Sequence, residues 1–534
     1  MKTDRRSLIT GAAALTAFNA LPRNARATGG AVVPPLTLGR AQQIVRQPQA
    51  SVAIANAPLS MQDQIVNDTT SNSLNSRRLC YAPTKSDITD IVLAFPGFGW
   101  YNNAEANFPV NYTVTASVEY PIGSTPHQVF FGGATSATVT AGRTLVKSDP
   151  YPVTIPAGAQ FAVKCYATWT AGNFWLGSLV ASSQTNEWTT RGTSLTDNTL
   201  NTTALTSTSN VAGFSPIVYA TLKNPTAVVG LVGDSIGTLT ADWTNTHSFG
   251  IGWGRALRNA IPFLNTAVGG DALSNYLSRP EGRGLLLRNA ITHCIMEMGG
   301  NDLFGGASLT TMQGYFQSAV TPFLDRGVKC YGVTFTPRTT SSDGWLTATN
   351  QTLVSSAVET VRQGYNTWMR TNWQSLGLSG YFDLAHAVDP TDSGKWSFDS
   401  GAAYAVSAPG AGDATLSNGV VQSISPYFYN SNNSLGAGYP TTGVTIPCVI
   451  YPYPNMGGSG AAANGIANSG QSFLNNFTVT AGGSGYGYPP MVTTQGTWTG
   501  DGVHPNGRGV NEIIYRCGST SSFGTVLAPE TFVL

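Results

Sequence analysis

Between residues 226 and 390 the chain carries three short, mostly apolar runs, which are separated by segments of helical composition. The runs cover residues 227–232, 291–298 and 328–335. Apolar residues at nearly every position, rather than at alternate ones, are typical of strands that are buried on both faces of a parallel sheet. Strands that alternate with helices predict a doubly wound α/β sheet, in which ligands bind at the carboxyl ends of the strands.

Helical composition and spacing occupy the segments between these runs and one segment near the end of the chain. The predicted helices cover residues 253–260, 273–290, 312–325, 348–376 and 509–516. Because each helix returns the chain to the starting edge of the sheet, the carboxyl ends of successive strands should meet at one rim.

Two regions outside this pattern predict β structure. Residues 61–222 alternate apolar and polar side chains with frequent Gly and Pro breaks, which indicates a β-sandwich. Residues 391–500 are rich in Gly, Ser, Asn, Tyr and Pro. A structureless loop of that length is improbable inside a compact domain, so we expect a small β-rich insertion there.

The first 27 residues predict an export signal, which a linker over residues 28–60 then follows. Arg5 and Arg6 precede a mildly apolar run, and the segment ends in Ala25-Arg26-Ala27, which has the small-x-small form of a cleavage site. Adjacent arginines before a weakly apolar run indicate the twin-arginine route, although an ordinary signal could also carry two arginines. We expect a periplasmic or extracellular protein without a membrane span, since no later run approaches the ~20 apolar residues that a spanning helix needs.

The charge balance and the cysteines exclude several classes of protein. Lys+Arg 28 against Asp+Glu 27 gives a net charge of +1, whereas gripping nucleic acid needs a large surplus of basic residues. Six cysteines are too sparse for a disulfide framework, and without a CxxC pair or a His/Cys cluster we predict no metal and no cofactor. Cys294 and Cys330 lie in predicted strands, as packed apolar residues. Pairing among Cys80, Cys165 and Cys448 stays open, as does the oligomeric state.

A candidate nucleophile follows the first predicted strand directly. Ser235 lies in the segment GDSIG at residues 233–237. A serine at a strand-to-helix turn presents its hydroxyl at the rim of the sheet, where the amides of the starting helix can face a developing oxyanion. Ser235 could equally be a simple N-cap, and the segment also fits the G-x-S-x-G elbow of another hydrolase class.

Three further polar segments follow along the chain, two of them after later strands and one near the end of the sequence. They are NTAVGGD at residues 265–271, GGND at 299–302 and DGVHPN at 501–506. Ser235 and Gly270 are 35 residues apart, and Gly270 and Asn301 are 31 apart, each about one strand plus one helix. The much longer interval from Asn301 to His504 holds the β-rich insertion, which should therefore emerge beside the histidine.

Together the four segments resemble the signature blocks of the SGNH, or GDSL-type, hydrolases, which supply Ser, Gly, Asn and His in this order. GGND and DGxHPN match the family pattern, whereas GDSI has Ile for the usual Leu. The resemblance covers residues 226–390 and the last segment from residue 501, which we assign to the hydrolase domain through 534. It implies a flavodoxin-like doubly wound parallel sheet and a serine ester hydrolase.

The resemblance also implies a role for each matching residue. Ser235 is the expected nucleophile, and His504 the base that takes its proton and later returns it to the leaving alcohol. Asp501 can hold the imidazole tautomer from three residues away. The main-chain N–H groups of Ser235 and Gly270 and the side-chain amide of Asn301 are the expected oxyanion hole.

Other polar residues near these segments are expected to be structural. Asp234 and Asp302 should serve as hydrogen-bonding residues of their turns, and Asp271 could cap the following helix. Asp383 is an outside candidate for orienting the base. The remaining histidines, at 127, 247, 293 and 386, stand outside the four polar segments, and any of them could be structural.

For the substrate we expect a small-molecule or polysaccharide ester, with short acyl groups such as acetyl on carbohydrate. Export, low charge and aromatic-rich β regions favour it, as does the similarity of residues 148–166 to jelly-roll accessory domains that precede some ester hydrolases. Aromatic residues of the insertion could stack on sugars or simply form its core. Lipase, lysophospholipase, thioesterase or acyltransferase activity, or a non-catalytic carbohydrate-binding surface protein, are the alternatives.

Overall fold

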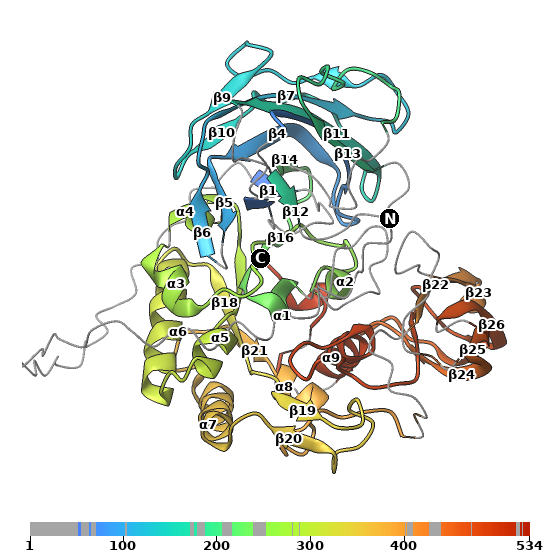
Figure 1. The fold of residues 1–534 in the computed structure, drawn as a ribbon. Coiled ribbons are helices and arrows are strands. Elements are labelled where there is room, and N and C mark those ends of the chain that lie inside the picture. Colours follow the sequence, from blue (N-terminus) through green and yellow to red (C-terminus); the bar gives the residue numbers. More distant parts are fainter. Residues whose placement is uncertain are drawn as a thin grey trace, which may run out of the picture. The chain divides into compact units, whose positions relative to one another are not determined.

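A computed structural model describes most of the chain after residue 70 (Figure 1). The described residues are 52–54, 63–65, 71–101, 104–170, 176–178, 187–205, 216–238, 253–279, 281–287, 289–400, 402, 410–426, 439, 441–470, 473–519, 524–525 and 527–534. All of them belong to the second of two compact units, residues 48–534. The predicted export signal, most of the predicted linker and His247 lie outside the described residues, so the predictions for them stay predictions.

The central element of the α/β region is a five-stranded sheet (Figure 1). Its strands, in spatial order, are β16 (Phe263–Asn265), β15 (Val229–Gly233), β17 (His293–Glu297), β18 (Lys329–Val333) and β21 (Gly380–Phe382). Every pair is parallel, and every residue of β15 and β17 is buried. The predicted α/β parallel sheet is confirmed, and its order is that of flavodoxin-like folds.

The described helices lie between these strands or follow the last of them. They are α1 (Ser235–Thr238), α2 (Trp253–Leu257), α3 (Leu273–Ser278), α4 (Glu281–Leu287), α5 (Gly300–Phe304), α6 (Leu309–Leu324), α7 (Ser356–Asn372), α8 (Leu384–Val388) and α9 (Gly507–Ser519). Two predicted helices were wrong in extent. The helix predicted over residues 273–290 is two helices, because Pro280 disfavours helical geometry at Arg279, whose φ is −141°.

The helix predicted over residues 348–376 begins late. Residues Gln351–Leu353 instead form β20, which pairs antiparallel with β19 (Thr339–Ser341). Helix α7 starts only after Ser355, whose side chain accepts a hydrogen bond from the Val358 N–H at 3.3 Å. The N-cap therefore fixes the start of this helix.

The region before residue 223 is made of mostly antiparallel strands. They are β1 (Val52–Ile54), β2 (Asp63–Ile65), β3 (Ser73–Tyr81), β4 (Ile88–Pro96), β5 (Phe98–Tyr101), β6 (Ala104–Asn107), β7 (Tyr112–Glu119), β8 (His127–Gln128), β9 (Ala137–Val139), β10 (Leu145–Lys147), β11 (Gln160–Trp169), β12 (Leu176–Ser178), β13 (Trp188–Gly192) and β14 (Ile217–Leu222). The sheet orders are β1-β14-β4-β10, β13-β3-β11-β7-β8 with β9 on β7, and β12-β2-β5-β6. The sandwich architecture, the jelly-roll likeness and the domain boundaries stay predictions.

Residues 391–500 contain a six-stranded antiparallel sheet. It consists of β22 (Ala411–Ser417), β23 (Val420–Pro426), β24 (Thr442–Tyr451), β25 (Ser459–Ser469), β26 (Leu474–Ser484) and β27 (Met491–Thr494), in the order β23-β22-β27-β24-β25-β26. Tyr439, Tyr453 and Tyr486 are each at most 6% exposed, so these tyrosines pack inside the protein and do not offer faces to a sugar. A β-bridge between Phe398 and Thr497 brings both ends of the segment together, shortly before His504.

All six cysteines are free, and five of them are buried. The open pairing among Cys80, Cys165 and Cys448 is therefore not realised. Cys294 and Cys330 face each other on β17 and β18 with no exposed surface, as expected for packed apolar residues. Among the described residues no helix has the length and apolar character to cross a membrane.

Candidate active site

Ser235 stands where the parallel sheet offers a binding crevice. Strand β15 ends at Gly233, helix α1 begins at Ser235, and β15 lies between β16 and β17. The chain runs from β15 first to one neighbour and then to the other, so the crevice at their carboxyl ends is the switch point of the fold. Glycine is required at 233 and 237, because a Cβ there would lie 2.6 and 2.5 Å from Oε2 of Glu297.

A chain of two hydrogen bonds joins Ser235 to a histidine and a carboxylate. The Nε2 atom of His504 lies 2.8 Å from the Ser235 Oγ, and its Nδ1 lies 2.7 Å from Oδ2 of Asp501. A carboxylate can only accept, so Nδ1 carries the proton and Nε2 is left to accept from the serine hydroxyl. This is the arrangement in which an imidazole can remove the serine proton.

The loop that carries His504 is fixed by its own backbone. Gly502 has a φ of +75°, and a Cβ there would lie 1.9 Å from the Thr339 carbonyl oxygen, so only glycine fits the turn. The Thr499 hydroxyl donates to the His504 carbonyl at 2.8 Å. Asn506 then caps α9 by accepting from the N–H groups of Arg508 and Gly509 at 3.0 and 3.1 Å.

Asp501 is held in its charged form. Burial would raise its pKa, but hydrogen bonds from the His504 side chain and from the backbone N–H groups of His504 and Val503 bring the pKa below its usual value. Those backbone bonds are both 2.8 Å long. A permanent negative charge beside Nδ1 favours the tautomer described above and an imidazolium that forms during reaction.

Two of the three expected oxyanion donors, Asn301 and Gly270, differ in their relation to the pocket at Ser235. The Asn301 side chain lines the same pocket as Ser235 and donates one N–H to the Asp271 carbonyl at 2.7 Å, which leaves its second N–H for a ligand. Gly270 has a φ of +81°, and none of the described residues accepts from its N–H, but it is not among the residues that line the pocket.

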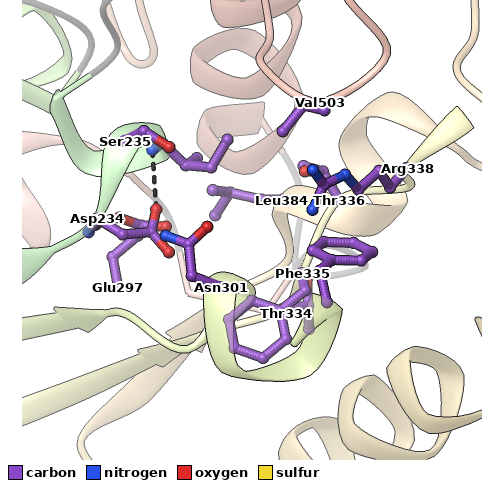
Figure 2. A pocket seen from close by; sticks show the side chains of 13 residues that line it. Asp234, Ser235, Glu297, Asn301, Thr334, Phe335, Thr336, Arg338, Leu384 and Val503 are labelled. Carbon is purple, nitrogen blue, oxygen red and sulfur yellow. Dashed lines mark hydrogen bonds between the residues drawn. The ribbon is translucent and has the colours of Figure 1, made fainter. Parts of the chain in front are cut away.

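The pocket at Ser235 is small. Its volume is about 30 Å³, and Figure 2 shows Ser235, Asp234, Glu297 and Asn301 on one side with Phe335, Thr336 and Arg338 on the other. The remaining lining residues are Ile236, Gly300, Phe304, Thr334, Leu384 and Val503. Among the described residues no three His, Cys, Asp or Glu side chains are arranged to hold a metal ion.

No protein-family model matches the chain, and no curated protein sequence matches it either. Solved structures that resemble it include AlinE4, an SGNH-hydrolase family esterase, at 17% identity over 29% of this chain and 75% of that chain, with a TM-score of 0.21. A member of the lipolytic G-D-S-L family from Veillonella parvula is 16% identical over 31% of this chain and 81% of that chain, with a TM-score of 0.23. A mutant acetyl-xylooligosaccharide esterase from Geobacillus is 12% identical over 30% of this chain and 77% of that chain, also with a TM-score of 0.23.

The chain is similar to SGNH hydrolases. These likenesses cover under a third of it at low TM-scores. The functional conclusion therefore rests on the geometry of Ser235, His504, Asp501 and Asn301 themselves.

Two buried carboxyl groups support the turn that holds Ser235. Glu297, the last residue of β17, accepts from the Asp234 N–H at 3.3 Å and from that of Gly237. Asp234 accepts from the Ile236 N–H at 2.9 Å and from that of Gly300. Asp234 is therefore the turn residue that the sequence predicts, and it ties the serine loop to the loop that carries Asn301.

The two carboxyl groups share a site that disfavours charge. Burial raises the pKa of Asp234 to about 7, partly offset by the Ile236 N–H and the His504 charge. Burial and the neighbouring Asp234 raise the pKa of Glu297 well above its usual range. A group whose pKa is higher in the folded chain binds more protons there, so the free energy of unfolding falls as pH rises from about 4 toward that folded value.

Glu297→Gln should reduce this pH dependence. The amide keeps an acceptor for the turn but removes one titrating carboxyl and the charge that acts on Asp234. We expect the fall in unfolding free energy between pH 5 and pH 8 to be smaller than in the natural protein, as measured by urea denaturation at each pH. The exposed Asp325→Asn is the control and should keep the natural slope; an unchanged slope in Glu297→Gln would contradict the assignment.

The other candidates have structural partners. Asp383 accepts from the Thr334 hydroxyl and pairs with Arg370 at 2.7 Å, so the alternative that it orients the base was wrong. Asp302 accepts from the Leu273 and Ser274 N–H groups at the start of α3. Asp271 pairs with Arg283 instead of capping that helix.

Two histidines outside the site also have definite environments. His293 is buried against Tyr331 and Phe532, while His127 is exposed and stacks on Tyr151. Two residues of the pocket, Glu297 and Arg338, were not predicted from the sequence. Glu297 could have been recognised, because it is the one carboxylate inside an apolar strand. Nothing in the sequence marks Arg338 except its position shortly after a strand.

Proposed function

We propose that this protein is a serine ester hydrolase that works through an acyl-Ser235 intermediate. The observation that carries the proposal is the continuous hydrogen-bonded chain from the Ser235 hydroxyl through His504 to Asp501. Asn301 beside it supplies a donor for developing negative charge. If Ser235 only capped the helix, it would need none of these partners.

The reaction runs in two halves. In the first, Ser235 Oγ attacks the ester carbonyl carbon while His504 Nε2 takes its proton, and the oxyanion that forms binds the Asn301 amide. The C–O bond then breaks, and His504 returns the proton to the departing alcohol. In the second half water attacks the acyl group, His504 takes and returns a proton again, and the acid leaves as the Ser235 hydroxyl reforms.

The size of the pocket supports a short acyl group. A volume of about 30 Å³ has room for a few water-sized groups, such as the atoms of an acetyl group, but not for a long alkyl chain. Phe335 and Phe304 are among the residues that line it. An acetyl group fits this space, whereas a long acyl chain would need a groove.

A carbohydrate as the alcohol is supported by a second cavity, in the β-rich region before residue 223. It has a volume of about 410 Å³ and is lined by residues 127–130 and 149–152. His127 and Tyr151 stack with ring centroids 5.6 Å apart, and Phe130 is 44% exposed beside them. Flat aromatic faces with few charges suit a sugar ring, and export, as predicted, would bring the protein to such polymers.

A panel of p-nitrophenyl acetate, butyrate and palmitate, together with acetylated xylan, tests the acyl preference. We expect kcat/KM for acetate to exceed that for palmitate by about a hundredfold or more, because a long acyl chain would clash with the walls of so small a pocket. A preference for palmitate would favour the lipase alternative and contradict the short-acyl proposal. Transfer to an added sugar in place of water would identify an acyltransferase.

A further inference from the structure

The pocket at Ser235 contains one basic side chain, Arg338. It follows β18 and lines the pocket together with Ser235 and Asn301. Figure 2 shows it reaching toward the middle of the pocket from the side opposite Ser235. Its guanidinium carbon lies 4.5 Å from the centre of the Phe304 ring, and the residue is only partly exposed.

Arg338 has an aromatic neighbour but no acceptor for its N–H groups. Within the described part of the chain, no carboxylate lies within 4.0 Å of its guanidinium and no side-chain hydrogen bond from it is formed. The other buried arginines named above do have partners: Arg283 pairs with Asp271 and Arg508 with Asp399. A guanidinium offers five donors in a planar fork, so this one is set to receive a ligand.

The charges around Arg338 leave it without a counter-ion of its own. Burial lowers its pKa, and the charge of Asp501 opposes that effect from a distance. Asp501 is already engaged by His504 and by two backbone N–H groups. Asp234 and Glu297 lie on the opposite side of the pocket, and burial raises the pKa of both carboxyl groups.

We propose that Arg338 is an anion subsite that selects esters bearing a carboxylate. This inference rests on the proposed function. The space beside Ser235 admits only a small acyl group, whereas the partly exposed Arg338 can also be reached from outside that space, so the carboxylate belongs to the alcohol part of the substrate. An acetylated uronic acid has this chemistry: an ester on a sugar ring whose C6 carboxylate can accept a paired hydrogen bond from the fork while Ser235 attacks the acetyl group.

A matched pair of substrates tests the subsite. Mono-acetylated methyl glucuronoside and methyl glucoside differ only in a carboxylate against a hydroxymethyl group. We expect the natural protein to prefer the glucuronoside at least about tenfold in kcat/KM, through a lower KM, as charge-assisted hydrogen bonds are worth about that much. Arg338→Met should remove this preference, and Arg338→Lys should retain part of it. The exposed Arg326→Met is the control and should behave like the natural protein.

Other outcomes would overturn the inference. If Arg338 only supports Asp501, Arg338→Met lowers kcat for both sugars alike and leaves their ratio unchanged. Hydrolysis of p-nitrophenyl acetate without a preference for the glucuronoside rejects the subsite and leaves the proposed function standing. Loss of all ester hydrolysis rejects the proposed function; binding of D-glucuronate to Ser235→Ala, weakened at least about tenfold by adding Arg338→Met, would then decide the subsite alone.

Discussion

His504→Ala is expected to lower kcat for acetyl ester hydrolysis by about 10⁴-fold or more. The loss follows from the two hydrogen bonds of the imidazole, which removes the Ser235 proton at Nε2 and is held by Asp501 at Nδ1. Rates with p-nitrophenyl acetate measure it, and circular dichroism checks that the fold is retained.

The double variant His504→Ala with Ser235→Ala sharpens this prediction. Residues that act as one unit are not additive, so the double variant should lose no more than either single one. If the fold-loss of the double variant equals the product of the two single losses, the serine and the histidine contribute independently. A His504→Ala protein that keeps a tenth of the natural rate would contradict the role of the histidine.

Asn301→Ala is expected to lower kcat by roughly 10²–10³-fold, with a much smaller change in KM. The Asn301 amide has one N–H on the Asp271 carbonyl and its second free to meet an oxyanion, and that charge exists only once the serine has attacked. Its benefit is therefore specific to the transition state. Steady-state kinetics on acetate esters separate the two constants.

The exposed Asn275→Ala on α3 is the matched control and should leave both constants unchanged. Loss of the Asp271 bond could also shift the loop that carries Gly270, so unfolding midpoints of both variants need comparison. A tenfold or smaller effect of Asn301→Ala on kcat would remove this side chain from the proposed oxyanion hole.

The order of the four polar segments predicted most of the candidate site. Each stands just after a strand or before a helix, and a parallel sheet collects the carboxyl ends of its strands at one edge whatever the sequence between them. This is why Ser235 and His504 could be placed together across 269 residues and a whole β-rich insertion. The spacing of the apolar runs therefore predicts which segments meet at the edge of the sheet, even when no contact is known.

What the sequence could not predict depends on partners distant in the chain. Asp383 was a candidate for orienting the base, but nothing in its own segment indicates that Arg370 lies beside it. The aromatic residues of the insertion allowed both a sugar platform and a core, and burial of Tyr439 and Tyr486 follows only from the pairing of its strands. Arg338 owes its place in the pocket to the turn after β18, which no local pattern marks.

Reaction with a fluorophosphonate probe tests whether Ser235 is the nucleophile, and it needs no knowledge of the natural ester. We expect one adduct by intact mass, located by peptide mapping on Ser235, which fails to form in Ser235→Ala and forms far more slowly in His504→Ala. A natural protein that stays unlabelled while folded, or that carries the adduct on another residue, would contradict it.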